Sequence, residues 1–196
     1  MDHKKDKKLA YSITQTLLGE PRAFQYIIDQ YQRLAFTIAL RIVKDREDAE
    51  EVVQDAFLKV YKNLEQHNRS SKFSSWLFKI VYNTALTKIR KRELDYTSLP
   101  GEVDDYGMDY GIERIDAWNS LKQQDRENFI GIAMENMKQE DALILSLYYL
   151  ADKDVSEICD IMDLKKSTTK VKLHRARAKL HVELNRLLKK ELKELL

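Results

Sequence analysis

The sequence predicts an all-α protein, with two small helical domains joined by an acidic flexible linker. Only 5 Gly and 2 Pro occur among 196 residues, which favours long helices over a turn-rich β fold. Apolar residues recur at spacings of three and four over most of the chain, the period of helices buried on one face. A segment near the middle breaks this period. We therefore expect a domain at residues 1–93, a linker at 94–117 and a second domain at 118–196.

Three helices are expected in the first domain, where they would form a small bundle. The apolar face of the first helix would consist of Phe24, Ile27, Ile28, Tyr31, Leu34, Ala35, Ile38 and Ile42. The apolar face of the second helix would consist of Ala49, Val52, Val53, Ala56, Phe57, Val60 and Leu64. The third would contain Trp76, Leu77, Ile80, Val81 and Ile89.

The linker is marked by its composition. Residues 94–113 hold three of the five glycines, one of the two prolines and no Lys or Arg. Such a segment cannot continue an apolar helix face, and Pro100-Gly101 punctuates it. We expect it to be acidic and partly disordered.

The second domain is expected to contain two helices followed by a tight helix pair. Asp154 and Glu157 have the spacing of a capping box at the start of the first helix of that pair. Asp163 falls where the chain must turn, and Asp tolerates the left-handed backbone conformation better than most residues. Leu164 would cover the turn, and a helix would start near Ser167. This order predicts a helix-turn-helix.

The charges are segregated along the chain. Residues 1–93 carry 18 basic and 12 acidic side chains, residues 94–136 carry 3 and 10, and residues 137–196 carry 13 and 10. Residues 165–179 hold seven Lys and Arg and no acid, which in a helix-turn-helix favours DNA binding over a solvated or membrane-surface helix. The residues expected to face DNA are Lys166, Thr168, Lys170, His174 and Arg177.

A second basic cluster ends the third helix of the first domain. It consists of Lys88, Arg90, Lys91 and Arg92, and aromatic residues precede it, a combination suited to single-stranded nucleic acid. The preceding helix instead has an acidic face, which would repel phosphate but suit a basic protein partner; an ordinary charged surface is the alternative.

Little in the sequence supports an enzyme. The four histidines (His3, His67, His174 and His181) make no metal-ligand spacing with each other or with Cys159. Neither a phosphate-binding glycine loop nor a nucleophile motif occurs. We predict no catalytic residue, no metal and no cofactor. The single cysteine, a start without a signal peptide and the lack of a run of about 18 apolar residues lead us to expect a cytoplasmic protein without a membrane span.

Three segments together resemble a known family. DREDAEEVVQDAFLKVYKNL resembles sigma region 2 where it docks on RNA polymerase core, and FSSWLFKIVYNTALTKIRKR resembles the adjoining segment that melts and reads the −10 promoter element. DVSEICDIMDLKKSTTKVKLHRARAKL resembles region 4, which reads the −35 element. In this order they are similar to the extracytoplasmic-function (ECF) group of sigma-70 family transcription initiation factors, over about residues 20–93 and 118–190.

The resemblance implies partners and site residues. The partners would be the clamp helices and flap region of RNA polymerase core, promoter DNA and an anti-sigma factor. The core-binding positions would be Asp48, Glu51, Gln54 and Asp55. The −10 positions would be His67, Asn83, Lys88, Arg90, Lys91 and Arg92. Region 4 positions matching the −35 contacts are Lys170, Val171, His174 and Arg175, beside Lys166, Thr168 and Arg177.

Some positions depart from the family pattern. His67 stands where many relatives carry an aromatic residue, and Thr87 replaces a usual Asp. Lys165 takes the place of a common Ser or Thr cap, which leaves Ser167 as the candidate cap. Two other functions stay open: a helix-turn-helix regulator that needs no polymerase, and a helical scaffold or membrane-surface protein.

Overall fold

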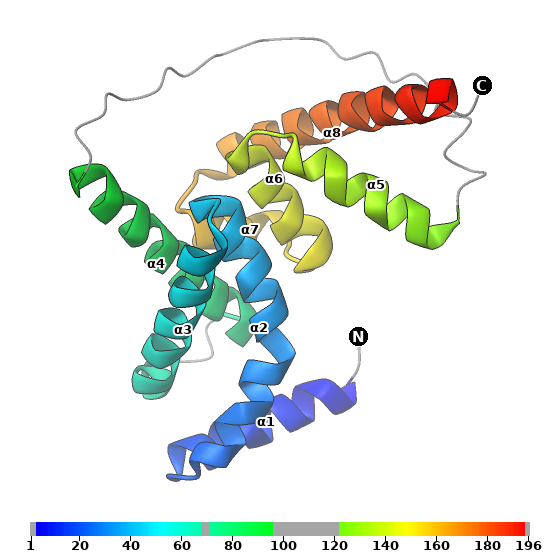
Figure 1. The fold of residues 1–196 in the computed structure, drawn as a ribbon. Helices are drawn as coiled ribbons and strands as arrows, with labels where there is room; N and C mark the ends of the chain where they lie inside the picture. The colour runs from blue at the N-terminus through cyan, green and yellow to red at the C-terminus, as the bar shows by residue number, and fades with distance from the viewer. Residues whose placement is uncertain (1–2, 68–70, 96–121, 195–196) are drawn as a thin grey trace.

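The computed structural model describes residues 3–67, 71–95 and 122–194, and all the regular structure in these ranges is helical (Figure 1). Within the same ranges, no helix combines the length and the apolar character that crossing a bilayer would require. The predicted linker, residues 94–117, lies outside the described residues except for its first two, which still belong to a helix.

The N-terminal half is built around α2 (Pro21–Val43), which packs against α1 (His3–Leu17), α3 (Arg46–Lys62) and α4 (Phe73–Asp95). Pro21 occupies the first turn of α2, where its missing N–H is not needed. At the other end Lys44 adopts the left-handed conformation, with φ at 62°, and Asp45 then caps α3 by accepting the Asp48 amide. The three predicted helices are therefore confirmed.

Helix α1 was not predicted from the sequence. Leu9 and Ile13 pack against the core and Ser12 and Thr16 are buried, while the lysines of the first turns are exposed. It crosses the end of α2 that lies away from α8 (Figure 1) and also contacts the short 3-10 helix η1 (Leu64–Gln66).

The C-terminal half contains α5 (Gln123–Glu135), α6 (Gln139–Leu145), a π-helical turn η3 (Ser146–Leu150), α7 (Val155–Met162) and α8 (Lys166–Glu194). The capping box of Asp154 and Glu157 is present at α7. Asp163 is left-handed at φ 54°, ψ 48°, and Leu164 packs on the core behind it. The predicted helix-turn-helix is therefore confirmed, including its capping box and its left-handed turn.

One boundary differs from the prediction. Helix α8 begins at Lys166, so Lys165 occupies the cap position and Ser167 lies inside the first turn. The prediction of Ser167 as the cap is therefore wrong. The α7–α8 connection is reinforced further along α8, where the Cys159 thiol donates to the Thr169 hydroxyl at 3.2 Å.

The two halves pack against each other. Helix α4 lies against α7, and α2 lies against α6 and η3, so the buried apolar residues form one continuous cluster. Gln139 at the start of α6 donates to the Ile42 carbonyl of α2 at 3.0 Å. The division into two domains with the limits expected above stays a prediction, but the helix-turn-helix sits directly on the N-terminal bundle.

Candidate functional site

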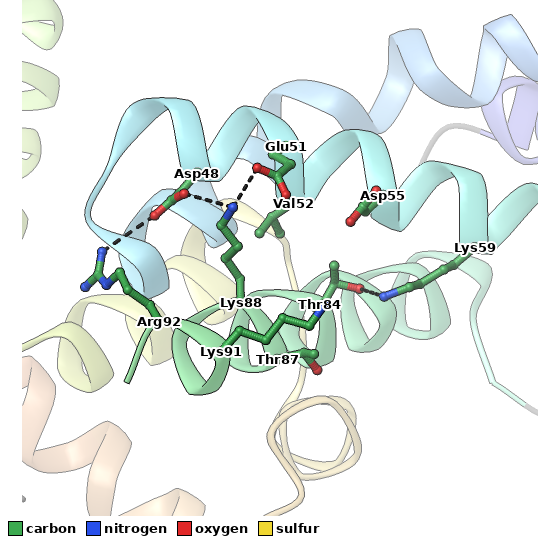
Figure 2. A pocket seen from close by; sticks show the side chains of 10 residues that line it. All are labelled: Asp48, Glu51, Val52, Asp55, Lys59, Thr84, Thr87, Lys88, Lys91 and Arg92. Atoms are coloured by element: carbon green, nitrogen blue, oxygen red, sulfur yellow. Dashed lines mark hydrogen bonds and ion pairs between the residues drawn. The ribbon is translucent and has the colours of Figure 1, made fainter. Parts of the chain in front are cut away.

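The acidic face of α3 meets the basic end of α4 (Figure 2). Lys88 Nζ lies 3.1 Å from a carboxylate oxygen of Asp48 and 2.6 Å from one of Glu51. Arg92 reaches the other Asp48 oxygen at 3.5 Å. Hydrogen bonds to Glu51 and then Asp48 raise the pKa of the Lys88 ammonium, so this cation is firmly charged at neutral pH.

A cavity of about 380 Å³ lies between these two helices. It is lined by residues predicted for two different partners, Asp48, Glu51 and Asp55 on one side and Lys88, Lys91 and Arg92 on the other. The structure thus brings together parts of the two predicted sites that the sequence suggested as separate surfaces. Gln54 lies apart from them, in a shallow groove with Phe36 and Val53.

The remaining −10 candidates are spread along α4. His67 is half-buried at the beginning of this helix, with its ring 5.2 Å from that of Trp76 and 5.5 Å from that of Phe73. Lys88 follows Trp76 by twelve residues, or about 18 Å along the helix axis. Asn83 is exposed between these ends, and Arg90 is exposed near the second. The −10 residues therefore form a row in order along the axis of α4, but they do not share one face, because Lys88 and Arg92 pair with α3 whereas Asn83 is exposed.

Helix α8 presents an exposed face at the helix-turn-helix. The −35 candidates exposed there are Lys166, Lys170, Val171, His174, Arg175 and Arg177, and Thr168 is half-buried. Val171 is 48% exposed, although it is apolar, so the fold leaves this side chain available for contact with a partner. Thr169, on the other side, is fully buried against α7.

Other cations of α8 are already paired. Lys172 Nζ lies 2.7 Å from Glu140 and Lys179 Nζ lies 2.6 Å from Asp141, both on α6. The Arg177 guanidinium lies over the Tyr148 ring, 4.6 Å from its centroid, and 5.6 Å from that of Tyr149. Arg177 therefore packs on the edge of the predicted DNA face, in a cation–π contact.

A polar cluster between the two halves was missed by the sequence analysis. The Glu157 carboxylate accepts hydrogen bonds from Ser75 Oγ at 2.6 Å and from Lys72 Nζ at 3.1 Å, both from α4 or the residue before it. Lys153 donates to Ser74 Oγ at 2.5 Å and lies 3.4 Å from Glu157. Glu157 was recognised only as half of a capping box, and no pattern in the sequence pairs it with residues 82 to 85 positions earlier.

Burial and hydrogen bonds act in opposite directions on the pKa of Glu157. Burial alone would raise the pKa of Glu157, but hydrogen bonds from Ser75, the Asp154 amide and Lys72 outweigh it and lower that pKa to about 2. The Lys153 side chain is only 4% exposed, and burial lowers its pKa although the Glu157 charge opposes this shift. The cluster is thus a buried ion pair that joins the helix-turn-helix to α4.

The sequence matches two family profiles. Residues 27–94 match Sigma-70 region 2, and residues 119–180 match Sigma-70, region 4. The ECF RNA polymerase sigma factor SigW of Bacillus subtilis is 26% identical over 183 residues, 88% of this chain and 94% of the relative. The ECF RNA polymerase sigma-E factor of Haemophilus influenzae is 26% identical over 163 residues, which cover 81% of this chain and 86% of that one.

The fold is shared with solved structures, of which two illustrate the match. One is CnrH in complex with the cytosolic domain of CnrY, with a TM-score of 0.58 and 17% identity over 89% of this chain and 96% of that chain. The other is the sigma factor RpoE of Bartonella quintana in complex with the anti-sigma factor NepR. Its TM-score is 0.60 and its identity is 21%, over 83% of this chain and 96% of that chain. Two profiles that together span most of the chain, with sigma-factor relatives along its length, place this chain in the sigma-70 family, as a transcription initiation factor of the ECF group.

Proposed function

We propose that this factor binds RNA polymerase core through α3, reads the −35 element with α8 and reads and helps melt the −10 element with α4. The observation that carries the proposal is the exposed face of α8, held on a capped helix-turn-helix. Helices of this kind enter the major groove and present their first turns to base edges. Lys172 and Lys179 are held in ion pairs with α6, and we propose that the exposed Lys166, Lys170 and Arg175 supply the cations that contact DNA.

Within that face the side chains divide by chemistry. Lys170 and Arg175 can contact phosphates or the acceptors of guanine, whereas Val171 can contact only a thymine methyl group. Of the −35 candidates, Arg177 packs on two tyrosines, and we assign it to holding α8 in place beside the DNA. A preference for thymine opposite Val171 follows from this assignment.

For the −10 element we propose that the row along α4 follows a single strand. At its first end the half-buried rings of His67 and Trp76 would stack on an unpaired base with their exposed parts, while the cations at its second end suit phosphates. Taking a base out of the duplex costs a few kcal/mol of stacking, which contacts from Asn83 would help to offset. Capture of unstacked bases would favour the melted promoter without ATP.

Engagement of both elements requires the two halves to separate. Elements centred near −10 and −35 lie about 25 base pairs, or roughly 85 Å, apart at about 3.4 Å per base pair. A compact chain of this length has a radius of gyration of only about 16 Å. We propose that the packed arrangement is the resting form and that core polymerase binds the separated form.

We propose further that an anti-sigma factor stabilises the packed form. Two of the structures that share the fold were solved as complexes, CnrH with the cytosolic domain of CnrY and RpoE with the anti-sigma factor NepR. The same proposal places the factor in the cytoplasm, where core polymerase and chromosomal DNA are found.

The test is run-off transcription with purified core polymerase and fragments of genomic DNA. We expect transcripts from a small set of promoters only when the factor is present. A variant with Lys170→Ala serves as the control, because it should lose −35-dependent transcripts and keep its affinity for core. Promoter-independent transcription, or none under any condition, would refute the proposal.

A further inference from the structure

The charged residues between α3 and α4 are joined by ion pairs, and their side chains are in contact with solvent. The side chains of Lys88 and Asp48 are 27% and 23% exposed, and those of Glu51 and Arg92 are 59% and 54% exposed. Ion pairs at such positions are weak because water screens both partners. A charged group from another molecule can therefore replace either member of a pair.

We propose that this cluster couples the two partners of the factor: a basic helix of core polymerase takes over Asp48 and Glu51, and Lys88 and Arg92 are thereby released to bind DNA phosphates. The inference rests on the proposed function, since it assumes that core binds the acidic face of α3 and that DNA binds the end of α4. It adds that the free factor holds its own DNA-binding cations in reserve.

The surroundings of the cluster fit such an exchange. Asp55 follows Glu51 by one turn and lines the same cavity, and among the described residues it has no cationic partner (Figure 2). Lys91 lines the opposite side and, in the same part of the chain, has no acidic partner. A cation of the partner can therefore bind Asp55 first, and a phosphate can bind Lys91 first. Each then lies beside the Lys88–Glu51 ion pair, where it can replace one member of that pair.

The coupling acts in both directions. If binding of core weakens the internal pairs, binding of DNA must raise the affinity for core by the same factor. Each released cation would strengthen DNA binding by about two- to fivefold, the range expected for an exposed ion pair. Two cations give a free factor that binds DNA poorly until core is present.

The experiment compares Glu51→Gln with Glu47→Gln in the full chain. Both changes remove one negative charge from α3, but Glu47 is exposed in the first turn and, in the described structure, lacks a cationic partner. The probe is a fluorescein-labelled oligo(dT) of about 12 nucleotides, followed by anisotropy at low salt, since phosphate contacts do not depend on sequence. Glu51→Gln removes the shorter of the two contacts of Lys88 and leaves that with Asp48 at 3.1 Å, so we expect it to bind this strand about twofold more tightly than Glu47→Gln.

A second pair of variants tests the origin of that gain. In a Lys88→Gln background, Glu51→Gln should bind the strand no more tightly than Glu47→Gln, because the cation to be released is gone. Equal affinities of the two single variants, or a gain that persists without Lys88, would overturn the inference. Circular dichroism melting curves confirm that each variant is folded.

Titration with core polymerase separates this inference from the function on which it rests. We expect Glu51→Gln to weaken core binding and Glu47→Gln to leave it unchanged. If the unmodified factor does not bind core, the proposed function fails whatever the strand-binding result. If core binding is normal and the strand-binding difference is absent, only the coupling fails.

Discussion

Replacing Glu157 with Gln tests how strongly the two halves are held together. Gln has nearly the same shape and can still take part in the capping box of α7, so the helix itself should survive. The substitution removes the negative charge that faces Lys153 and Lys72. Because the Lys153 side chain is 4% exposed, it would be left as a buried cation without its ion-pair partner, with only the weaker influence of the Asp152 charge remaining.

The pKa of Glu157 sets the magnitude. A shift from 4.5 to about 2 means that the packed structure favours the charged carboxylate by about 3 kcal/mol, at about 1.36 kcal/mol per pKa unit. Part of this comes from the Asp154 amide, which Gln can still bind, so we expect a loss of about 2 kcal/mol in the free energy of unfolding. In a chain of this length that lowers Tm by about 4–8 °C.

The assay is differential scanning calorimetry at pH 7, with Asp160→Asn as the control. Asp160 is an exposed acid on the same helix with no ion-pair partner in the described part of the chain. X-ray scattering should also show a larger radius of gyration for Glu157→Gln than for Asp160→Asn. If the two variants melt within about 1 °C of each other, the reasoning from burial is wrong.

Four further outcomes follow. The stabilisation from Glu157 is present above pH 4.5 and is lost as the pH falls towards about 2, because its pKa is lowered in the packed form; Tm measured against pH should fall in that window. Lys170→Ala should weaken binding to a −35 duplex by about tenfold, and the slope of affinity against salt should decrease by about one, in anisotropy titrations. Asp55→Arg should weaken core affinity by at least about tenfold in a fluorescence titration, through repulsion of a basic partner. Asp163→Val should lower stability to urea by about 1–2 kcal/mol, since a β-branched residue is strained at φ 54°.

Local features of the fold could be predicted from the sequence because they depend on near neighbours. The capping box of α7 needs only Asp154 and Glu157 three residues apart, and the left-handed turn needs only Asp163 between two apolar periods. Helix α1 escaped prediction because its buried face includes the polar residues Ser12 and Thr16 beside Leu9 and Ile13, which weakens the apolar period.

The missed parts of the site depend on distant contacts. The sequence indicated an acidic α3 and a basic end of α4, but charge patterns do not reveal that Lys88 would pair with Glu51, 37 positions earlier. The contact of Lys153 with Ser74 likewise depends on how two separately built halves meet. Periodicity fixes which face of a helix is buried, and it does not identify the helix that covers that face.

The π-helical turn η3 has a consequence for the register of the helix-turn-helix. In it the Ala151 amide donates to the Ser146 carbonyl, five positions back, which amounts to one residue inserted into an α-helix. The wider turn brings the Tyr148 and Tyr149 rings within 4.9 Å of each other, and both lie near Arg177. Deletion of one residue here would restore ordinary helical winding and shift these two rings, so we expect the bulge to set how η3 supports Arg177 of α8.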